Sequence, residues 1–269
     1  MKAIGRNERL AEECGVSQLL VGPTGVGKTS QGKTLESMFS RTLVVNIEAG
    51  ILPIRHLPVA SVSVKTMREF MDLACALGGP NPALPPNWVF SQAHFDKVST
   101  DPDLTSLAQY DVLFVDSLTA LSRLSYTHCE QLPEAVTDRG RKDTRAIYGA
   151  HARHMLGTLN HLQHARKRTI VFVAILERVT DDFNVAPWQP QLEGAKTGRE
   201  LPGIVDEVIT MNWIDFGDGK PPTRAFVCTS PNPWGYPAKD RSGQLEQLEP
   251  PDLGKLLKKL TPSITTGES

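Results

Sequence analysis

Short apolar runs recur along the chain and alternate with segments whose apolar positions have helical spacing. The apolar runs are typical of buried strands, and they cover 17–22, 42–47, 59–64, 111–116, 169–176, 206–213 and 224–229. The helical spacing predicts helices over 27–39, 65–77, 116–126 and 143–167. Strands that alternate with helices indicate an α/β fold with a mostly parallel central sheet and helices on both faces.

Two stretches interrupt this alternation. Residues 78–88 are too rich in proline for a helix or strand, and 178–203 exceeds the usual length of a structureless loop. We find no internal repeat and no boundary for a second domain. The expected organisation is an N-terminal extension (1–16), one core (17–247) with antiparallel strands added at its C-terminal side, and a C-terminal helix with a flexible tail (248–269).

Composition agrees with one globular domain in the cytoplasm. The chain has 269 residues, of which 40% are hydrophobic and 22% are charged. No apolar run is long enough to span a bilayer, so no membrane partner is expected, and the charged N-terminus does not resemble a signal peptide. With a formal net charge of -1, a site for a polyanion would have to be a local basic patch.

The segment GPTGVGKTS follows the first expected strand and opens the first expected helix. It matches the pattern GxxxxGK[ST], in which glycines let backbone N–H groups approach phosphates. Lys28 would reach the β- and γ-phosphates of ATP, and the Thr29 hydroxyl would bind Mg²⁺. The expected nucleotide-binding residues are Gly22, Pro23, Thr24, Gly25, Val26, Gly27, Lys28, Thr29 and Ser30.

Two acidic residues follow other expected strands. Asp116 ends the run DVLFVD, where a carboxylate can hold Mg²⁺ directly or through water. Glu48 follows the strand 42–47 and could act as the general base that activates water. A solvated glutamate at a strand end is the alternative interpretation of Glu48.

The order of these motifs resembles that of the RecA-like ATPases, a group of P-loop NTPases. GPTGVGKTS, LVVNIEAG, VLFVDSLTAL, a long helix and TIVFVAILE follow one another over roughly 15–230. The resemblance implies a RecA-like fold, ATP and Mg²⁺ as ligands, and hydrolysis of ATP in which Glu48 and Lys28 are catalytic. GRELPGIVDEVI and WGYPAKDRSGQL are most similar to compact phage nucleotide-binding proteins, which include single-strand-annealing ATPases.

That closer resemblance implies action on single-stranded DNA in phage recombination, annealing or repair. It further implies DNA-stimulated hydrolysis, a ring or filament of identical subunits, a single-strand-binding protein as a further partner, and the host cytoplasm as the compartment. Lys239 and Arg241 in AKDRSG would then complete the ATP site of a neighbouring subunit. The alternative is an ordinary charged surface turn.

Two basic segments occupy the places of the two DNA loops in the resembling family. The first, EAVTDRGRKDTR, offers Arg139, Arg141 and Lys142 to DNA phosphates, although neighbouring aspartates dilute its charge. The second, 178–203, offers Lys196 and Arg199 together with Phe183 and Trp188. Trp188 is equally consistent with a hydrophobic anchor.

One departure from the family keeps other functions open. RecA-like proteins usually carry a polar γ-phosphate sensor near the end of the strand that matches 169–176, where this chain has Ile175 and Leu176. An ATP-gated assembly or loading factor of a replication or packaging machine, with weak or no hydrolysis, is therefore an alternative. A small-molecule phosphoryl transferase is another, although it would require an acceptor pocket and an arginine-rich lid.

Overall fold

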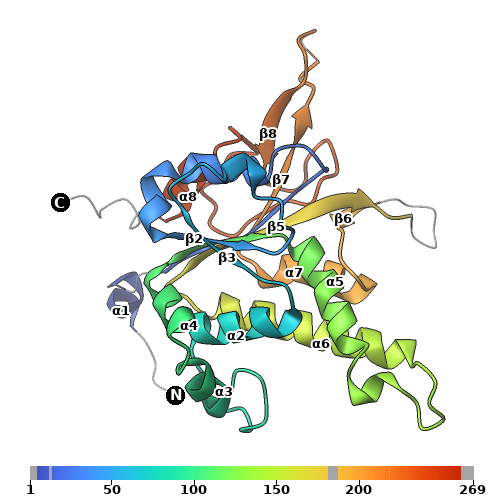
Figure 1. Ribbon diagram of the computed structural model, residues 1–269. Helices are drawn as coiled ribbons and strands as arrows, with labels where there is room; N and C mark the ends of the chain where they lie inside the picture. The colour runs from blue at the N-terminus through green and yellow to red at the C-terminus, as the bar shows by residue number, and fades with distance from the viewer. Residues whose placement is uncertain (1–4, 12–13, 181–186, 218, 262–269) are drawn as a thin grey trace.

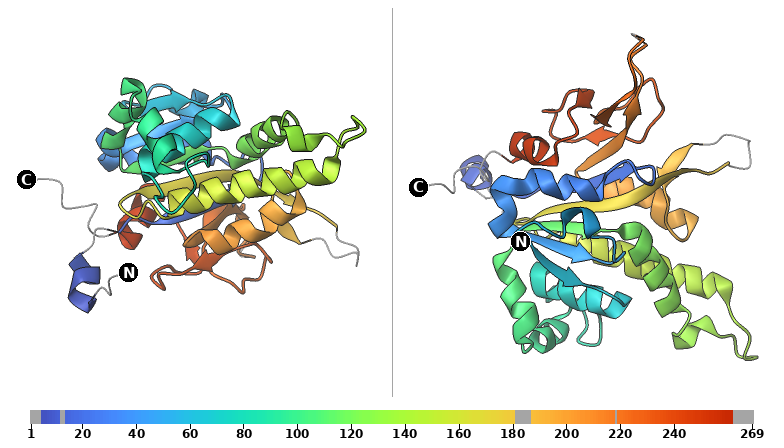
Figure 2. Two further views of the ribbon diagram at one scale, coloured as in Figure 1. Left: turned by 90° about the horizontal axis from the view of Figure 1, so that it is seen from below. Right: turned by 45° about the horizontal axis from the view of Figure 1, so that its top comes forward.

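The computed structural model describes residues 5–11, 14–180, 187–217 and 219–261. A twisted sheet runs through the middle of the molecule, and helices cover both of its faces (Figure 1 and Figure 2). Its strand order is β10-β8-β7-β1-β5-β4-β2-β3. The strands are β1 (Ser17–Gly22), β2 (Thr42–Asn46), β3 (Ala60–Ser63), β4 (Val112–Asp116), β5 (Thr169–Arg178), β6 (Trp188–Pro190), β7 (Glu207–Ile214), β8 (Thr223–Val227), β9 (Lys239–Asp240) and β10 (Leu248–Glu249).

Parallel pairing dominates this sheet. β1 pairs in parallel with β5 and β7, β4 pairs in parallel with β5 and β2, and β2 pairs in parallel with β3. β8, β9 and β10 join the C-terminal side in antiparallel pairs. The predicted fold class is therefore confirmed. Because the six parallel strands point the same way, their carboxyl ends, including Gly22 and Asp116, meet at one edge of the sheet.

Each face of the sheet buries its own core. On one face, α2 (Met67–Gly78), α5 (Leu118–Cys129) and α6 (Thr144–Gln163) pack over side chains such as Leu19 and Phe172. On the other face, η1 (Thr29–Arg41) and α8 (Leu253–Leu260) pack over Leu20 and Phe114. The remaining helical segments are α1 (Arg6–Ala11), η2 (Leu52–Ile54), α3 (Gln92–Val98), α4 (Pro102–Ser106), η3 (Leu107–Gln109), η4 (Pro133–Ala135) and α7 (Ala195–Ile204).

Local capping fixes where the central helices begin. Thr66 and Glu69 form a capping box at the start of α2. Asp143 accepts a hydrogen bond from Ala146 N at 3.0 Å and begins α6. Gln31 and Thr34 of η1 accept hydrogen bonds from the first residues of α8, at 3.1 Å in each case. The C-terminal helix is thus joined to the core through η1.

The structure corrects several predicted elements. The helix expected at 27–39 is a 3₁₀ helix over Thr29–Arg41, with non-helical backbone angles at Leu35. The helix expected at 143–167 ends at Gln163. The described part of 178–203 is not a structureless loop, because β6 pairs with β5 and α7 follows it. The short helices α3 and α4 were missed, because their seven and five residues are too few to show helical periodicity. No helix in the described residues is long and apolar enough to cross a bilayer.

A buried glutamate predicts how stability responds to pH. Burial, followed by the charge and hydrogen bond of Asp240, raises the pKa of Glu207 to about 8. The folded state therefore holds a proton that the unfolded state has lost, so stability should fall as pH rises from about 4.5 to about 8. The limiting slope for one proton is about 1.4 kcal/mol per pH unit. Glu207→Gln should flatten this decline in urea unfolding at several pH values. An unchanged slope would contradict the assignment.

Candidate active site

Residues 23–28 form a loop between β1 and η1 at the carboxyl edge of the sheet. Gly25 and Gly27 have positive φ angles of 79° and 104°, a region that glycine adopts without strain. Gly22 is required for another reason, because a Cβ there would lie 2.4 Å from the Met211 carbonyl oxygen. These glycines explain how the sequence folds into a phosphate-binding loop.

Lys28 is buried at the base of this loop. Its Nζ donates hydrogen bonds to the carbonyl oxygens of Gly22 and Pro23, at 2.8 and 2.9 Å. Burial lowers the pKa of Lys28, and the charges of Asp116 and Glu48 oppose this shift. The cation is thus placed inside the loop that would surround the phosphates.

Thr29 and Asp116 meet across the end of the sheet. Thr29 Oγ1 donates a 2.6 Å hydrogen bond to Asp116 Oδ2. Burial raises the pKa of Asp116, the hydrogen bond from Thr29 opposes that rise, and the Glu48 charge adds to it. One hydroxyl and one carboxylate beside a phosphate loop fit Mg²⁺, which is usually held by one or two protein ligands together with the nucleotide. Thr29 and Asp116 would therefore hold this metal.

Glu48 lies beside the same charges. Backbone N–H groups of Ile47 and Glu48 both donate to the Asp116 carbonyl oxygen, at 2.8 and 3.3 Å. This attaches the exposed Glu48 to the end of β4. The effect of its charge on both Lys28 and Asp116 shows that the three groups form one electrostatic cluster. Its position suits a base that acts on water in front of the terminal phosphate.

A hydrogen bond near this cluster joins α5 to β5, two elements that extend away from the site. Thr119, in the first turn of α5, is buried, and its Oγ1 accepts a hydrogen bond from Ile175 N at 3.0 Å. β5 continues beyond this point and pairs with β6. Gln191 Nε2, just after β6, donates to Glu177 Oε2 at 3.0 Å. Sequence reasoning missed Thr119, although its place three residues after Asp116 could have indicated it.

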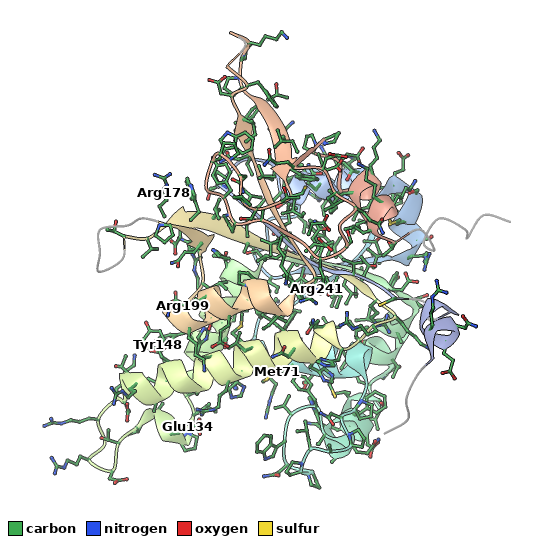
Figure 3. The ribbon with its side chains drawn as sticks, turned by 180° about the vertical axis from the view of Figure 1, so that it is seen from behind. Met71, Glu134, Tyr148, Arg178, Arg199 and Arg241 are labelled. Atoms are coloured by element: carbon green, nitrogen blue, oxygen red, sulfur yellow. The ribbon has the colours of Figure 1, made fainter. Side chains whose placement is uncertain are left out.

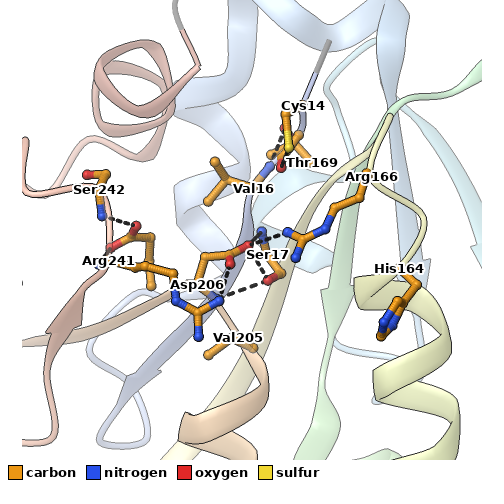
Figure 4. A network of polar contacts seen from close by, with 12 residues as sticks. Cys14, Val16, Ser17, His164, Arg166, Thr169, Val205, Asp206, Arg241 and Ser242 are labelled. Carbon is orange, nitrogen blue, oxygen red and sulfur yellow. Dashed lines mark hydrogen bonds and ion pairs between the residues drawn. The ribbon is translucent and has the colours of Figure 1, made fainter. Parts of the chain in front are cut away.

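Lys239 and Arg241 lie at the opposite end of the sheet, because β9 pairs with the first residues of β7. Lys239 Nζ donates to the carbonyl oxygens of Pro202 and Val205, at 3.0 and 2.7 Å. Arg241 pairs with Asp206 at 2.7 Å, in the network that Figure 4 shows. Both cations thus have partners within their own chain, and their action on a neighbour's nucleotide stays a prediction.

An arm formed by residues 130–143 projects between α5 and α6. At its tip, Thr137 N donates to Arg141 O at 2.8 Å, and Gly140 has a φ of 70°. Arg139 and Arg141 are exposed there and have no ion pair among the described residues. Lys142 instead pairs with Glu130 and lies 5.8 Å from the Tyr126 ring centroid.

The β5–β6 hairpin projects from the same edge as this arm, and α7 lies between them (Figure 3). The Arg178 guanidinium lies 4.6 Å from the Trp188 ring centroid, and the Trp188 ring also packs on Tyr236. Trp188 is half-buried, which supports its interpretation as an anchor. On α7, Arg199 is exposed and Lys196 lies 3.8 Å from Glu200. Phe183 lies outside the described residues.

Comparison with known proteins supports the site. A family model described as an AAA domain matches residues 15–242. No curated protein matches the chain. The fold is similar to that of the flagellar accessory protein FlaH from Methanocaldococcus jannaschii, with 10% identity, a TM-score of 0.41, and 88% of this chain and 84% of that chain covered. An ATPase from the type III secretion system of pathogenic bacteria has 14% identity and a TM-score of 0.39, with 74% of this chain and 51% of that chain covered.

The matched family segment contains the phosphate loop together with Glu48 and Asp116. It also spans the parallel core from β1 to β7 and continues to β9. Family membership and site geometry therefore agree on a nucleotide site of the P-loop ATPase type. The chain belongs to the AAA domain family, and its P-loop lies at the edge of a mostly parallel α/β sheet.

Proposed function

We propose that this protein hydrolyses ATP with Mg²⁺ and couples hydrolysis to single-stranded DNA, in the manner of the phage annealing ATPases that its sequence resembles. The observation that carries the ATPase part is the cluster of Lys28, Asp116 and Glu48, with Thr29 bonded to Asp116 at 2.6 Å. Lys28 and the loop amides hold the phosphates, and Glu48 takes a proton from the attacking water. Mg²⁺, when bound, neutralises developing charge on the phosphates.

The DNA part is supported by the two projections at the carboxyl edge of the sheet. The 130–143 arm carries the exposed Arg139 and Arg141. Lys196 and Arg199 are exposed on α7, which lies between this arm and the β5–β6 hairpin. Such cations bind backbone phosphates without reading sequence. We expect Lys142 to contribute less than Arg139 and Arg141, because Glu130 already neutralises it.

A route for coupling leads from the ATP site to both projections. α5 begins two residues after Asp116 and leads into the arm, while β5 leads into the β5–β6 hairpin. The hydrogen bond from Ile175 N to Thr119 Oγ1 joins the two elements near the site. A shift of β4 upon ATP binding would therefore reach both candidate DNA surfaces.

We also propose that the chain assembles into a ring or filament in which Lys239 and Arg241 meet a neighbour's ATP. Their position away from the chain's own phosphate loop is compatible with action in trans. The Arg241 side chain is 48% exposed, so an incoming phosphate could reach it. It would have to compete there with Asp206, the present partner of Arg241.

The DNA part is tested by Arg139→Ala combined with Arg141→Ala. Wild-type protein should retain a single-stranded oligonucleotide at low salt and hydrolyse ATP faster in its presence. Removing two phosphate contacts should reduce the slope of log K against log salt by about 1.4 and lower the stimulation of ATPase activity. Fluorescence anisotropy over a salt series measures the slope.

A control with the same charge change is Lys97→Ala combined with Lys258→Ala, since both lysines are exposed on other helices. It should leave the slope unchanged. If wild-type protein retains no single-stranded DNA at low salt, the DNA proposal is wrong.

The apolar Ile175 and Leu176 at the end of the family's sensor strand favour one second candidate function. An ATP-gated assembly or loading factor would bind ATP and change its oligomeric state with little hydrolysis. ATP binding that drives assembly, without DNA stimulation of hydrolysis, would support this function over the first.

A further inference from the structure

The strand order indicates where the nucleoside end of ATP must lie. β1, which leads into the phosphate loop, has β5, β4 and β2 on one side and β7 and β8 on the other. Asp116 ends β4 and Glu48 follows β2, so the metal and the terminal phosphate belong to that side. A triphosphate that lies across the loop with its γ-phosphate toward Glu48 extends its nucleoside toward β7 and β8.

The β7–β8 hairpin passes beside the loop on this side (Figure 1). Thr210 of β7 is in register with Val21 of β1, and β7 continues to Ile214. Side chains alternate along a strand, so Trp213 shares a face with Met211, which packs in the same core as Val26. Trp213 therefore lies on the face of the sheet that carries the phosphate loop, just beyond that loop.

Arg224 links this tryptophan to the phosphate loop. It is the direct cross-strand partner of Trp213, and its Cζ lies 5.4 Å from the Trp213 ring centroid. Its Nη1 is 3.4 Å from the carbonyl oxygen of Val26 and would lie 2.8 Å from a Cβ on Gly27. The guanidinium thus contacts the aromatic ring and the loop at the same time.

Trp213 is exposed to solvent. Its exposed fraction is 55%, although it lies next to the phosphate loop and contacts the Arg224 guanidinium. An exposed aromatic ring offers a stacking surface to any base, and an arginine beside it adds positive charge near the phosphates. A nucleoside triphosphate bound in the loop would meet the ring with its base and the arginine near its phosphates, on the side of the loop opposite the metal.

We propose that the β7–β8 hairpin binds the nucleoside end of ATP, with Trp213 stacking on the adenine base and Arg224 holding Trp213 against the phosphate loop. The inference rests on ATP binding by the proposed ATPase but not on DNA coupling. Sequence reasoning missed both residues. The turn-forming run DFGDGKPP between them could have predicted a hairpin that pairs Trp213 with Arg224.

The test compares the affinities of ATP and inorganic tripolyphosphate, which has no nucleoside. Trp213→Ala should weaken ATP binding by about 5- to 150-fold, the range for loss of base–aromatic stacking. Its affinity for tripolyphosphate should stay within about twofold of the wild-type value, because the phosphate loop is intact. Trp213→Phe, which keeps a stacking ring, should restore most of the ATP affinity. Arg224→Met should lower the ratio of ATP affinity to tripolyphosphate affinity as well.

Trp88→Ala is the matched control, because Trp88 is 58% exposed and lies between α2 and α3, away from the phosphate loop. It should change neither affinity. Equal losses of ATP and tripolyphosphate affinity in Trp213→Ala would overturn the proposal, as would unchanged ATP affinity. If wild-type protein bound neither ATP nor tripolyphosphate, the proposed ATPase function would be wrong. This outcome is distinct from a failure of the Trp213 proposal alone.

Discussion

Glu48→Gln is expected to lower kcat for ATP hydrolysis by about 10²- to 10⁴-fold, the contribution of a positioned general base. ATP should still bind, because Lys28 and the loop amides that hold the phosphates are unchanged. Glutamine keeps the size and hydrogen-bonding capacity of the side chain but cannot accept a proton at neutral pH. Steady-state hydrolysis and equilibrium binding of ATP, measured on the same preparation, separate the two effects.

The substitution should also change the electrostatics of the site in a defined direction. The negative charge of Glu48 raises the pKa values of both Lys28 and Asp116. Removing it lessens repulsion between the site and an incoming triphosphate, so ATP affinity should stay equal or increase slightly. A large loss of affinity would indicate that Glu48 binds ATP and is not a base.

Glu36→Gln provides the control for charge removal, since Glu36 is exposed on η1, the helix that follows the phosphate loop. It should leave both turnover and affinity near their wild-type values. Normal turnover in Glu48→Gln would leave the solvated strand-end glutamate as the correct interpretation of this residue.

The fold and the phosphate site were predictable because their signals are local. Buried parallel strands are continuous apolar runs, and the glycines of GPTGVGKTS act through their own backbone angles. Asp116 could be placed because it ends a strand, and the ends of parallel strands share one edge. Each of these features is contained in a short stretch of sequence.

Partners from distant parts of the chain were not predictable in the same way. Nothing near Arg241 in the sequence indicates its pairing with Asp206, 35 positions earlier. Nothing near Arg224 indicates contact with Val26, 198 positions away. β6 was overlooked because it has only three residues, paired to the end of β5, and so leaves little periodicity in the sequence. These features depend on contacts between residues that are far apart in the chain, and such contacts cannot be identified from a single sequence.

Lys28→Met is expected to separate nucleotide binding from folding. Loss of a buried, hydrogen-bonded charge that faces the phosphates should cost about 2–5 kcal/mol of binding free energy, or roughly 30- to 5000-fold in Kd. In the absence of nucleotide, the buried charge of Lys28 destabilises the folded state. Burial lowers the pKa of Lys28, and its hydrogen-bond acceptors are two neutral carbonyl groups that do not compensate its charge. Methionine keeps the apolar stem and removes that cost.

Thermal unfolding with and without Mg-ATP measures both consequences. Without nucleotide, two lost hydrogen bonds offset the relief of desolvation, so the free energy of unfolding should change by no more than about 1 kcal/mol. Wild-type protein at an ATP concentration of about 100 times its Kd should gain about 2.7 kcal/mol, and Lys28→Met at the same ATP concentration should gain no more than about 0.9 kcal/mol. Lys33→Met, at an exposed position on η1, should behave as wild type in both measurements. At a given ATP concentration, the stabilisation by ATP depends only on the Kd of the variant. A shift of Tm in Lys28→Met as large as that of wild type would therefore contradict the proposal that Lys28 binds the phosphates.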